Sequence, residues 1–189
     1  MYEATGVLRN EHEVILRVLG ATEATANAIE AGSNVSAQYL QDTVEFLRLY
    51  ADRQHHGKEE DLLFPELEEK GLPRNGGPVG MMLMEHRFGR SHIARMAAAA
   101  TASASGDRAA AATWADAALD YVALLREHIA KENQILFAMA ERILSADDQA
   151  RLSVEFAGVD TNKMGEGERM RLLQLAERLA NQAAQIVRS

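Results

Sequence analysis

The sequence predicts an all-α protein in which four long helices are followed by two further helices. Good helix formers such as alanine, leucine, glutamate and arginine are abundant, whereas aromatic residues make up only 5% of the chain. Glycine and proline gather in one stretch, residues 71–80, which holds four glycines and two prolines. Elsewhere the apolar residues recur at helical spacing, which indicates amphipathic helices.

The first two helices have recognisable ends. The first is expected from about Val7 to Gly32, because glycine readily adopts the left-handed conformation that ends a helix. The second is expected from a cap near Ser36 to about Lys70. Pro65 lies inside this second helix and lacks a backbone donor, so it should kink the helix or restart it.

The third helix is expected over residues 81–105, after the glycine-rich loop. A turn at Gly106 and Asp107 then leads into a fourth helix that ends near Leu144. Residues 1–144 would form a four-helix unit, and residues 145–189 a C-terminal helical extension. An apolar stripe on the last helix predicts that the extension covers the bundle or pairs with a second subunit as a homodimer.

Composition excludes several functional classes. The net charge of −8 argues against a nucleic-acid partner, because phosphate binding needs a basic face. The absence of cysteine excludes disulfides, thiolate metal sites and cysteine nucleophiles. The first residues lack a signal-peptide pattern, and an apolar run of about 18 residues is missing, so a cytoplasmic protein without a membrane partner is expected.

A ten-residue repeat carries the candidate chemistry. HHGKEEDLLF (55–64) and HIAKENQILF (128–137) share histidine, lysine, glutamate and a final aliphatic pair with phenylalanine in one register. The register pairs His55 with Glu59 and His128 with Glu132 at four-residue spacing, about 5–6 Å apart on one helix face. Such an imidazole and carboxylate can converge on one or two metal ions.

The repeat also distinguishes between the two adjacent histidines and between the two adjacent glutamates of its first copy. His56 and Glu60 stand opposite Ile129 and Asn133, which differ from them chemically, so they are predicted to lie outside the metal-binding set, His56 exposed or behind it. Lys58 and Lys131 recur and are expected to be solvated charges.

Two further histidines fall at the level of the repeat. If neighbouring helices are antiparallel, residues equidistant from a turn lie at the same height. His12 and His55 are about equally far from Gly32, and His86 and His128 from the next hairpin turn. His92 points to another face and is not expected to be a ligand. Six side chains are therefore candidate metal ligands: His12, His55, Glu59, His86, His128 and Glu132.

Four histidines and two glutamates are too many for one tetrahedral zinc ion. They suit two cations bridged by the carboxylates, and iron is the metal we favour, with zinc second. The di-iron pattern of ferritin-like bundles, Glu-x-x-His, is absent from these helices.

With these motifs, EHEVIL, HHGKEEDLLFP, MEHRFGR and HIAKENQILF, the chain resembles the hemerythrin-like (HHE cation-binding) proteins over about residues 7–144. The resemblance implies an up-down-up-down bundle around two non-haem iron ions with an oxo or hydroxo bridge. It also implies that the four histidines are terminal ligands and that Glu59 and Glu132 bridge the irons. Oxygen-carrying hemerythrins have a fifth histidine one turn from the residue at 86, where this chain has Met82 and Arg90.

Fewer imidazoles leave open metal positions, which favours redox chemistry over reversible oxygen carriage. The resemblance therefore implies a protein that binds or reacts with O2, NO or H2O2 in oxidative or nitrosative stress or iron homeostasis. Weak peroxidase, catalase-like or NO reductase activity is compatible with it. Two alternatives stay open: an iron-responsive or iron-storing interaction module without turnover, and a zinc-bound or metal-free structural bundle.

Apolar and aromatic side chains are expected around the site. Residues one turn from the proposed ligands predict an apolar sleeve, to which Leu16, Leu63, Met82 and Leu136 belong. Two phenols, Tyr50 and Tyr121, lie within two turns of a histidine, so they either hydrogen-bond a bound ligand or pack in the core.

Overall fold

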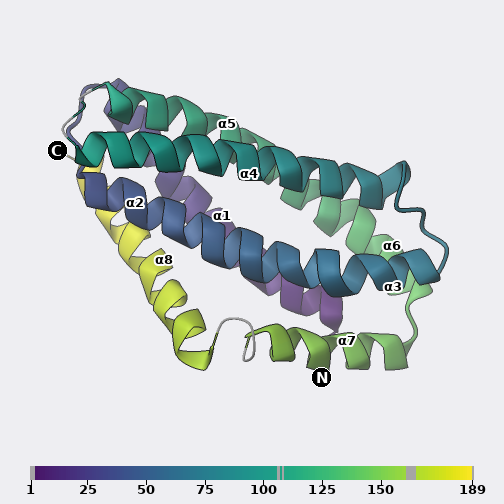
Figure 1. Cartoon of the computed structure of the whole chain (residues 1–189). Coiled ribbons are helices and arrows are strands. Elements are labelled where there is room, and N and C mark those ends of the chain that lie inside the picture. Colours follow the sequence, from purple (N-terminus) through teal and green to yellow (C-terminus); the bar gives the residue numbers. More distant parts are fainter. Residues whose placement is uncertain (1–2, 106, 108, 161–164, 189) are drawn as a thin grey trace.

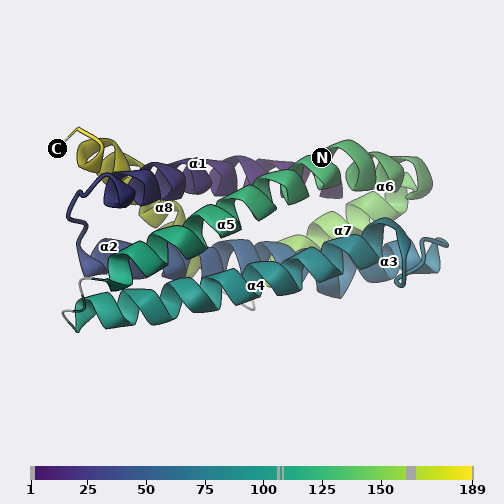
Figure 2. The ribbon, with the colours of Figure 1, turned by 90° about the horizontal axis from the view of Figure 1, so that it is seen from above.

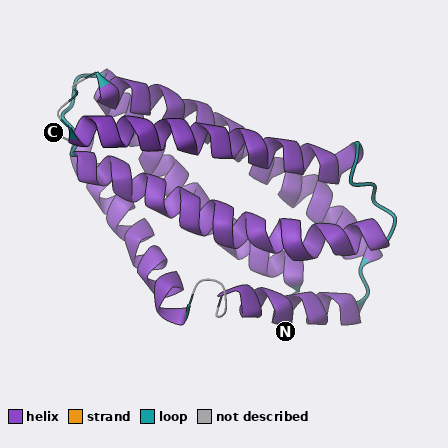
Figure 3. Cartoon of the chain, in the orientation of Figure 1, coloured by secondary structure: helices purple, strands orange, loops and turns teal. Residues whose placement is uncertain are grey.

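The computed structural model of the chain describes residues 3–105, 107, 109–160 and 165–188, and at Glu166 it describes the backbone alone. Every regular element within these residues is a helix (Figure 3), so the predicted all-α class is confirmed. None of the helices in the described ranges is both long and apolar enough to cross a membrane.

The first long helix is α1, Ala4–Glu30, and it ends at Gly32, whose φ of +96° is the predicted left-handed stop. The second long helix is capped by Ser36, whose side chain accepts a hydrogen bond from the Tyr39 amide. It comprises four consecutive segments: α2 (Ala37–Phe46), η1 (Leu47–His56), η2 (Glu59–Leu63) and α3 (Phe64–Glu69).

The segments η1 and η2 are π-helical, so their backbone turns are wider than those of an α-helix. The α-helical pattern restarts at Phe64, and Pro65 lies in the first turn of α3, where a missing amide hydrogen is tolerated. The same change from π- to α-helix occurs at Phe137 without a proline, so the kink or restart expected at Pro65 stays a prediction.

The third long helix is α4, Gly77–Ala104, which begins four residues earlier than its pattern predicted. The fourth comprises α5 (Ala110–Lys131), the π-helical η3 (Glu132–Leu136) and α6 (Phe137–Ile143). The predicted turn between them includes Gly106, which lies outside the described residues. Both copies of the sequence repeat thus contain a π-helical segment that begins at the glutamate and ends at the second aliphatic residue.

The four long helices form an up-down-up-down bundle (Figures 1 and 2). Helix α1 contacts the second and fourth long helices, and α4 contacts the same two from the opposite corner. Helices α7 (Ala146–Gly158) and α8 (Glu166–Ile186) lie along the side formed by α1 and the second long helix (Figure 1). The extension therefore packs on the bundle of its own chain.

Two apolar cores fill the bundle. One, near the 31–36 turn, includes Trp114 and receives the predicted stripe of α8, with Leu172 and Leu179 fully buried. The other, near the 70–76 loop, includes Phe137 and receives Phe156 of α7. Between the two cores lies a layer of buried polar side chains, which contains the candidate site.

Candidate metal centre

All four long helices contribute to the buried polar layer. The six predicted ligands are at most 1% exposed: His12, His55, Glu59, His86, His128 and Glu132. The rings of His12 and His55 are 4.6 Å apart between centroids, and those of His86 and His128 are 4.8 Å apart. The structure therefore brings the four histidines to one height, as the distances from the turns predicted.

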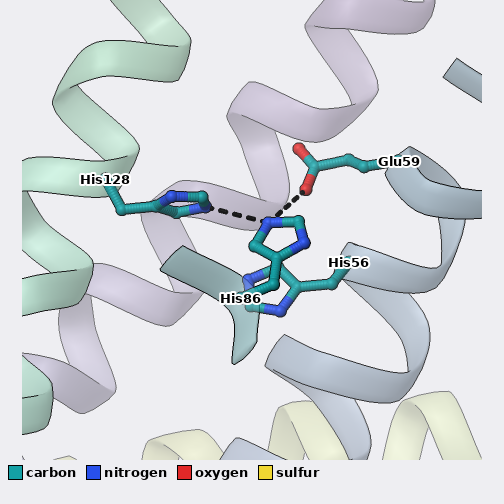
Figure 4. Close-up of side chains that lie close together, drawn as sticks. All are labelled: His56, Glu59, His86 and His128. Carbon is teal, nitrogen blue, oxygen red and sulfur yellow. Dashed lines mark hydrogen bonds and ion pairs between the residues drawn. The ribbon is translucent and has the colours of Figure 1, made fainter. Parts of the chain in front are cut away.

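The nitrogen and oxygen atoms of this layer form two sets, each with all its ligand atoms within 4.8 Å of one another. The first set comprises His12, His55, Glu59 and Glu132. The second comprises His56, Glu59, His86 and His128, shown in Figure 4. Glu59 belongs to both sets.

Each glutamate directs one oxygen toward each set. Glu132 Oε2 lies 3.1 Å from His12 Nε2, and its Oε1 lies 3.2 Å from His128 Nε2. Glu59 Oε1 lies 3.5 Å from His55 Nε2, and its Oε2 lies 3.5 Å from His86 Nε2. Each carboxylate could therefore supply one oxygen to a cation in either set.

The innermost atoms lack ordinary partners. Both oxygens of Glu59, both oxygens of Glu132, and Nε2 of His12 and His55 are buried without a well-formed hydrogen bond among the described residues. Buried polar atoms are nearly always satisfied, so a group of unpartnered atoms that face a common centre indicates residues suited to hold a cation. Imidazole nitrogens and carboxylate oxygens are donors that divalent iron or zinc accepts, and the donor set therefore fits a pair of metal ions.

The ionisation of the site fits the same conclusion. Burial, followed by the charge of Glu132, raises the pKa of Glu59 well above its usual range. Burial acts on Glu132 in the same direction, but His128 and His12 outweigh it and lower its pKa. The two carboxylates thus resist being charged together without cations, and bound metal would remove that conflict.

Each of the four histidines has an acceptor for its outer ring nitrogen. His55 Nδ1 donates to Glu11 at 3.0 Å, and His128 Nδ1 donates to Glu85 at 2.9 Å. The other two bonds are His12 Nδ1 to Asn133 Oδ1 at 3.0 Å and His86 Nδ1 to Glu60 Oε1 at 2.7 Å. When the ring is neutral, a proton held on Nδ1 leaves the lone pair on Nε2, which is how protein metal sites orient imidazoles. In His86 and His128 the two Nε2 atoms lie 3.1 Å apart.

The two lysines of the repeat belong to this outer layer. Lys58 is fully buried and pairs with Glu11, so the expectation that it is solvated was wrong. Lys131, whose side chain is 35% exposed, pairs with Glu85 in the equivalent way. The unrecognised signal was a second repeat: Glu11 and Glu85 each directly precede a candidate histidine of α1 or α4.

The site is therefore built from two similar halves. Each half is a hairpin of two helices, one with Glu-His and the other with His-x-x-Lys-Glu. Glu60 and Asn133, which differ chemically in the sequence repeat, perform the same role, since each accepts from the Nδ1 of a histidine in the other hairpin. The halves differ in the group that accepts this hydrogen bond. It is the carboxylate of Glu60 for His86 and the amide oxygen of Asn133 for His12.

His56 lies closer to the site than the repeat predicted. Its side chain is buried, and its ring stacks on His86 with centroids 3.8 Å apart (Figure 4). Its Nδ1 lies 3.4 Å from Asp52 Oδ1. Burial, followed by the charge of His86, lowers the pKa of His56 to about 3, so the ring is neutral and able to donate a lone pair. The structure adds His56 to the candidate ligands.

The other predicted residues surround the site or lie apart from it. Leu63, Met82 and Leu136 belong to the core below the polar layer, and Leu16 packs, half-buried, on the core above it. Tyr50 and Tyr121 are buried in that upper core, where burial raises the pKa of each phenol. His92 lies near the surface, 3.9 Å from Asp120, and is not part of either set.

Comparison with known proteins agrees with this arrangement. A family model described as the hemerythrin HHE cation binding domain matches residues 3–140. Uncharacterized proteins of Mycobacterium tuberculosis and Mycobacterium bovis are each 26% identical to the chain over 159 residues. Those alignments cover 84% of this chain but only 62% of each relative, so the chain spans less than two thirds of their length. No solved structure matches the chain significantly.

Proposed function

Because the chain belongs to the hemerythrin HHE cation-binding family, we propose that it holds two non-haem iron ions and binds or reacts with a small ligand such as O2, NO or H2O2. The family membership and the buried histidine and glutamate sets make it a metal-binding protein. The choice of iron rests on the mixture of imidazole and carboxylate donors.

One observation carries the proposal: Glu59 and Glu132 each turn one oxygen toward either set. One metal would be held by His12 and His55, and the other by His86 and His128 with His56 available. Glu59 belongs to both sets, and Glu132, a member of the first, also lies 3.2 Å from His128 Nε2. A pair of iron ions held in this way supplies redox-active centres with positions open to a small ligand.

The chain's own residues prepare the site for that chemistry. The Nδ1 hydrogen bonds fix the direction of four imidazoles and hold a proton on the outer nitrogen of each ring. The apolar core below the layer, with Leu63, Met82 and Leu136, keeps water from that side. A dry, preoriented site favours binding of a small uncharged ligand over hydrolytic chemistry.

Metal analysis of protein expressed in iron-replete medium, combined with absorption spectra, tests the proposal. Two irons per chain are expected, with a spectrum that changes on addition of peroxide or NO. Zinc, or no metal, would contradict the assignment of iron. Two irons with a spectrum indifferent to O2, NO and peroxide would instead favour an iron-storing or iron-responsive module.

Single histidine variants are expected to separate the two metal positions. His55→Ala should lower the affinity for the metal of the first set by more than about 100-fold, because it removes a ligand. Loss of an outer-layer partner lowers metal affinity by only about 10–100-fold. His56→Ala should weaken only the second metal, and by less, because His86 and His128 remain. Iron titration of the metal-free variants measures both effects, with the surface variant His92→Ala as control. Equal loss from His55→Ala and His92→Ala would contradict the assignment.

A further inference from the structure

A chain of buried polar contacts joins the C-terminal extension to the first metal set. It begins at Asp160, just beyond the end of α7, whose Oδ1 lies 2.7 Å from both Lys58 Nζ and Gln54 Nε2. Lys58 also donates to Glu11, and Glu11 Oε2 accepts from His55 Nδ1 at 3.0 Å. Two side chains therefore separate Asp160 from a candidate ligand.

The members of this chain of contacts are buried, so each charged group in it needs a partner. Lys58 and Gln54 are 0% exposed and Glu11 is 2% exposed. A fully buried lysine is rare unless its charge is paired, because an ammonium group loses its hydration on burial. Glu11 alone leaves part of that ammonium unpaired, and Asp160 supplies the second carboxylate.

The equivalent contacts in the other half do not include a residue of the C-terminal extension among the described residues. There Lys131 pairs with Glu85, and its side chain is 35% exposed to solvent. Helices α7 and α8 make most of their contacts with α1 and the second long helix. The extension therefore reaches one of the two metal sets selectively, and the bundle's own symmetry supplies an internal comparison.

From this asymmetry we propose that Asp160 is a positioning residue of the metal centre, which couples docking of the C-terminal extension to metal binding by His12 and His55. The inference rests on the proposed metal binding but not on the metal being iron. Lys58 and Glu11 transmit the contact by holding the His55 ring in its ligating orientation. Linkage is reciprocal, so metal at this set must in turn stabilise the docked extension.

The test compares Asp160→Asn with Asp148→Asn. Asp148 also lies on α7 and pairs at 2.7 Å with Lys70, the residue that follows α3. The printed partners of Lys70 are Asp148 and Glu66, neither of which is a candidate ligand. Metal-free protein is titrated anaerobically with Fe²⁺, and separately with Co²⁺, against a competing chelator. Asp160→Asn should weaken one of the two binding steps by about 10–100-fold and leave the other within about threefold. Asp148→Asn should leave both steps within about threefold.

Hydrogen exchange supplies a readout that does not depend on activity. Metal loading should slow amide exchange in α8 of the wild-type protein and of Asp148→Asn, but not of Asp160→Asn. If Asp160→Asn fails to fold, Gln54→Met removes another Asp160 contact without changing charge, and it should weaken the same step several-fold.

The outcomes separate the two proposals. The coupling would be overturned if the wild type binds both metals and Asp160→Asn binds them with unchanged affinity. It would also be overturned if Asp148→Asn lowers metal affinity as much as Asp160→Asn does. In both cases the proposed metal centre would stand. Unchanged α8 exchange on metal loading would overturn the coupling as well. A wild-type chain that binds neither Fe²⁺ nor Co²⁺ would overturn the metal centre and, with it, the coupling.

Discussion

Replacing Glu132 with glutamine is expected to abolish tight binding of both metals at once. The side chain is fully buried, and its two oxygens lie 3.1 Å from His12 Nε2 and 3.2 Å from His128 Nε2, one histidine of each set. Glutamine has the same shape but presents an amide group, a donor with no negative charge, in place of one oxygen. Each metal should therefore lose more than about 100-fold in affinity, beyond the loss typical of an outer-layer residue.

The matched control is Glu127→Gln, an exposed glutamate on the same long helix. It should bind two metals with wild-type affinity. Iron stoichiometry and chelator competition measure both variants, with far-UV circular dichroism to show that each is folded. Retention of one tightly bound metal by Glu132→Gln would show that the carboxylate serves a single position and would contradict the bridged arrangement.

Removing the metal is expected to lower the melting temperature substantially. A ligand that binds only the folded chain stabilises it by about 4 kcal/mol per site when the free ligand exceeds its Kd by 1,000-fold. For a chain of this size that corresponds to roughly 8–16 °C per site. Calorimetry of metal-loaded and chelator-treated protein measures the difference. Equal melting temperatures would show that metal does not bind the folded state preferentially.

Glu59→Gln should stabilise the metal-free protein and destabilise the metal-loaded protein. In the metal-free chain, burial and the charge of Glu132 raise the pKa of Glu59 above its unfolded value. The folded state then holds a proton that the unfolded chain releases, so stability falls as pH rises from the usual glutamate range toward the raised pKa. At neutral pH, glutamine should stabilise the metal-free protein by about 1–2 kcal/mol.

With metal in excess the wild type should be more stable than Glu59→Gln, because the variant lacks a ligand that belongs to both sets. Urea unfolding of both proteins at pH 7, with and without metal, measures the crossing. A variant less stable than the wild type in the absence of metal would indicate that Glu59 is a structural hydrogen-bond partner rather than a metal ligand.

Much of the fold was accessible from the sequence because its signals are local. Helix spacing and the glycine stop at Gly32 both depend on near neighbours. The height of the histidines followed from rise per residue and the antiparallel order alone. Sequence reasoning therefore found six residues that the structure brings into one layer.

His56 was placed outside that set because it stands opposite Ile129 in the sequence repeat. In an α-helix two adjacent side chains diverge widely, so only one of His55 and His56 would face inward. The π-helical segment η1 ends on both residues, and its wider turns bring adjacent side chains closer in direction. Burial of Lys58 was missed for a different reason: its second partner, Asp160, is more than a hundred residues away.

Two copies of one metal-holding hairpin within a single chain have an evolutionary consequence. A substitution in one copy leaves the other intact, so the copies are free to diverge separately. The two segments differ where His56 stands opposite Ile129 in the repeat and Glu60 opposite Asn133. The second set thereby has an extra imidazole, that of His56, and a carboxylate behind His86, whereas the first set has an amide behind His12. A dimer of identical hairpins would be held to two equal positions, whereas the fused chain can specialise each of its own.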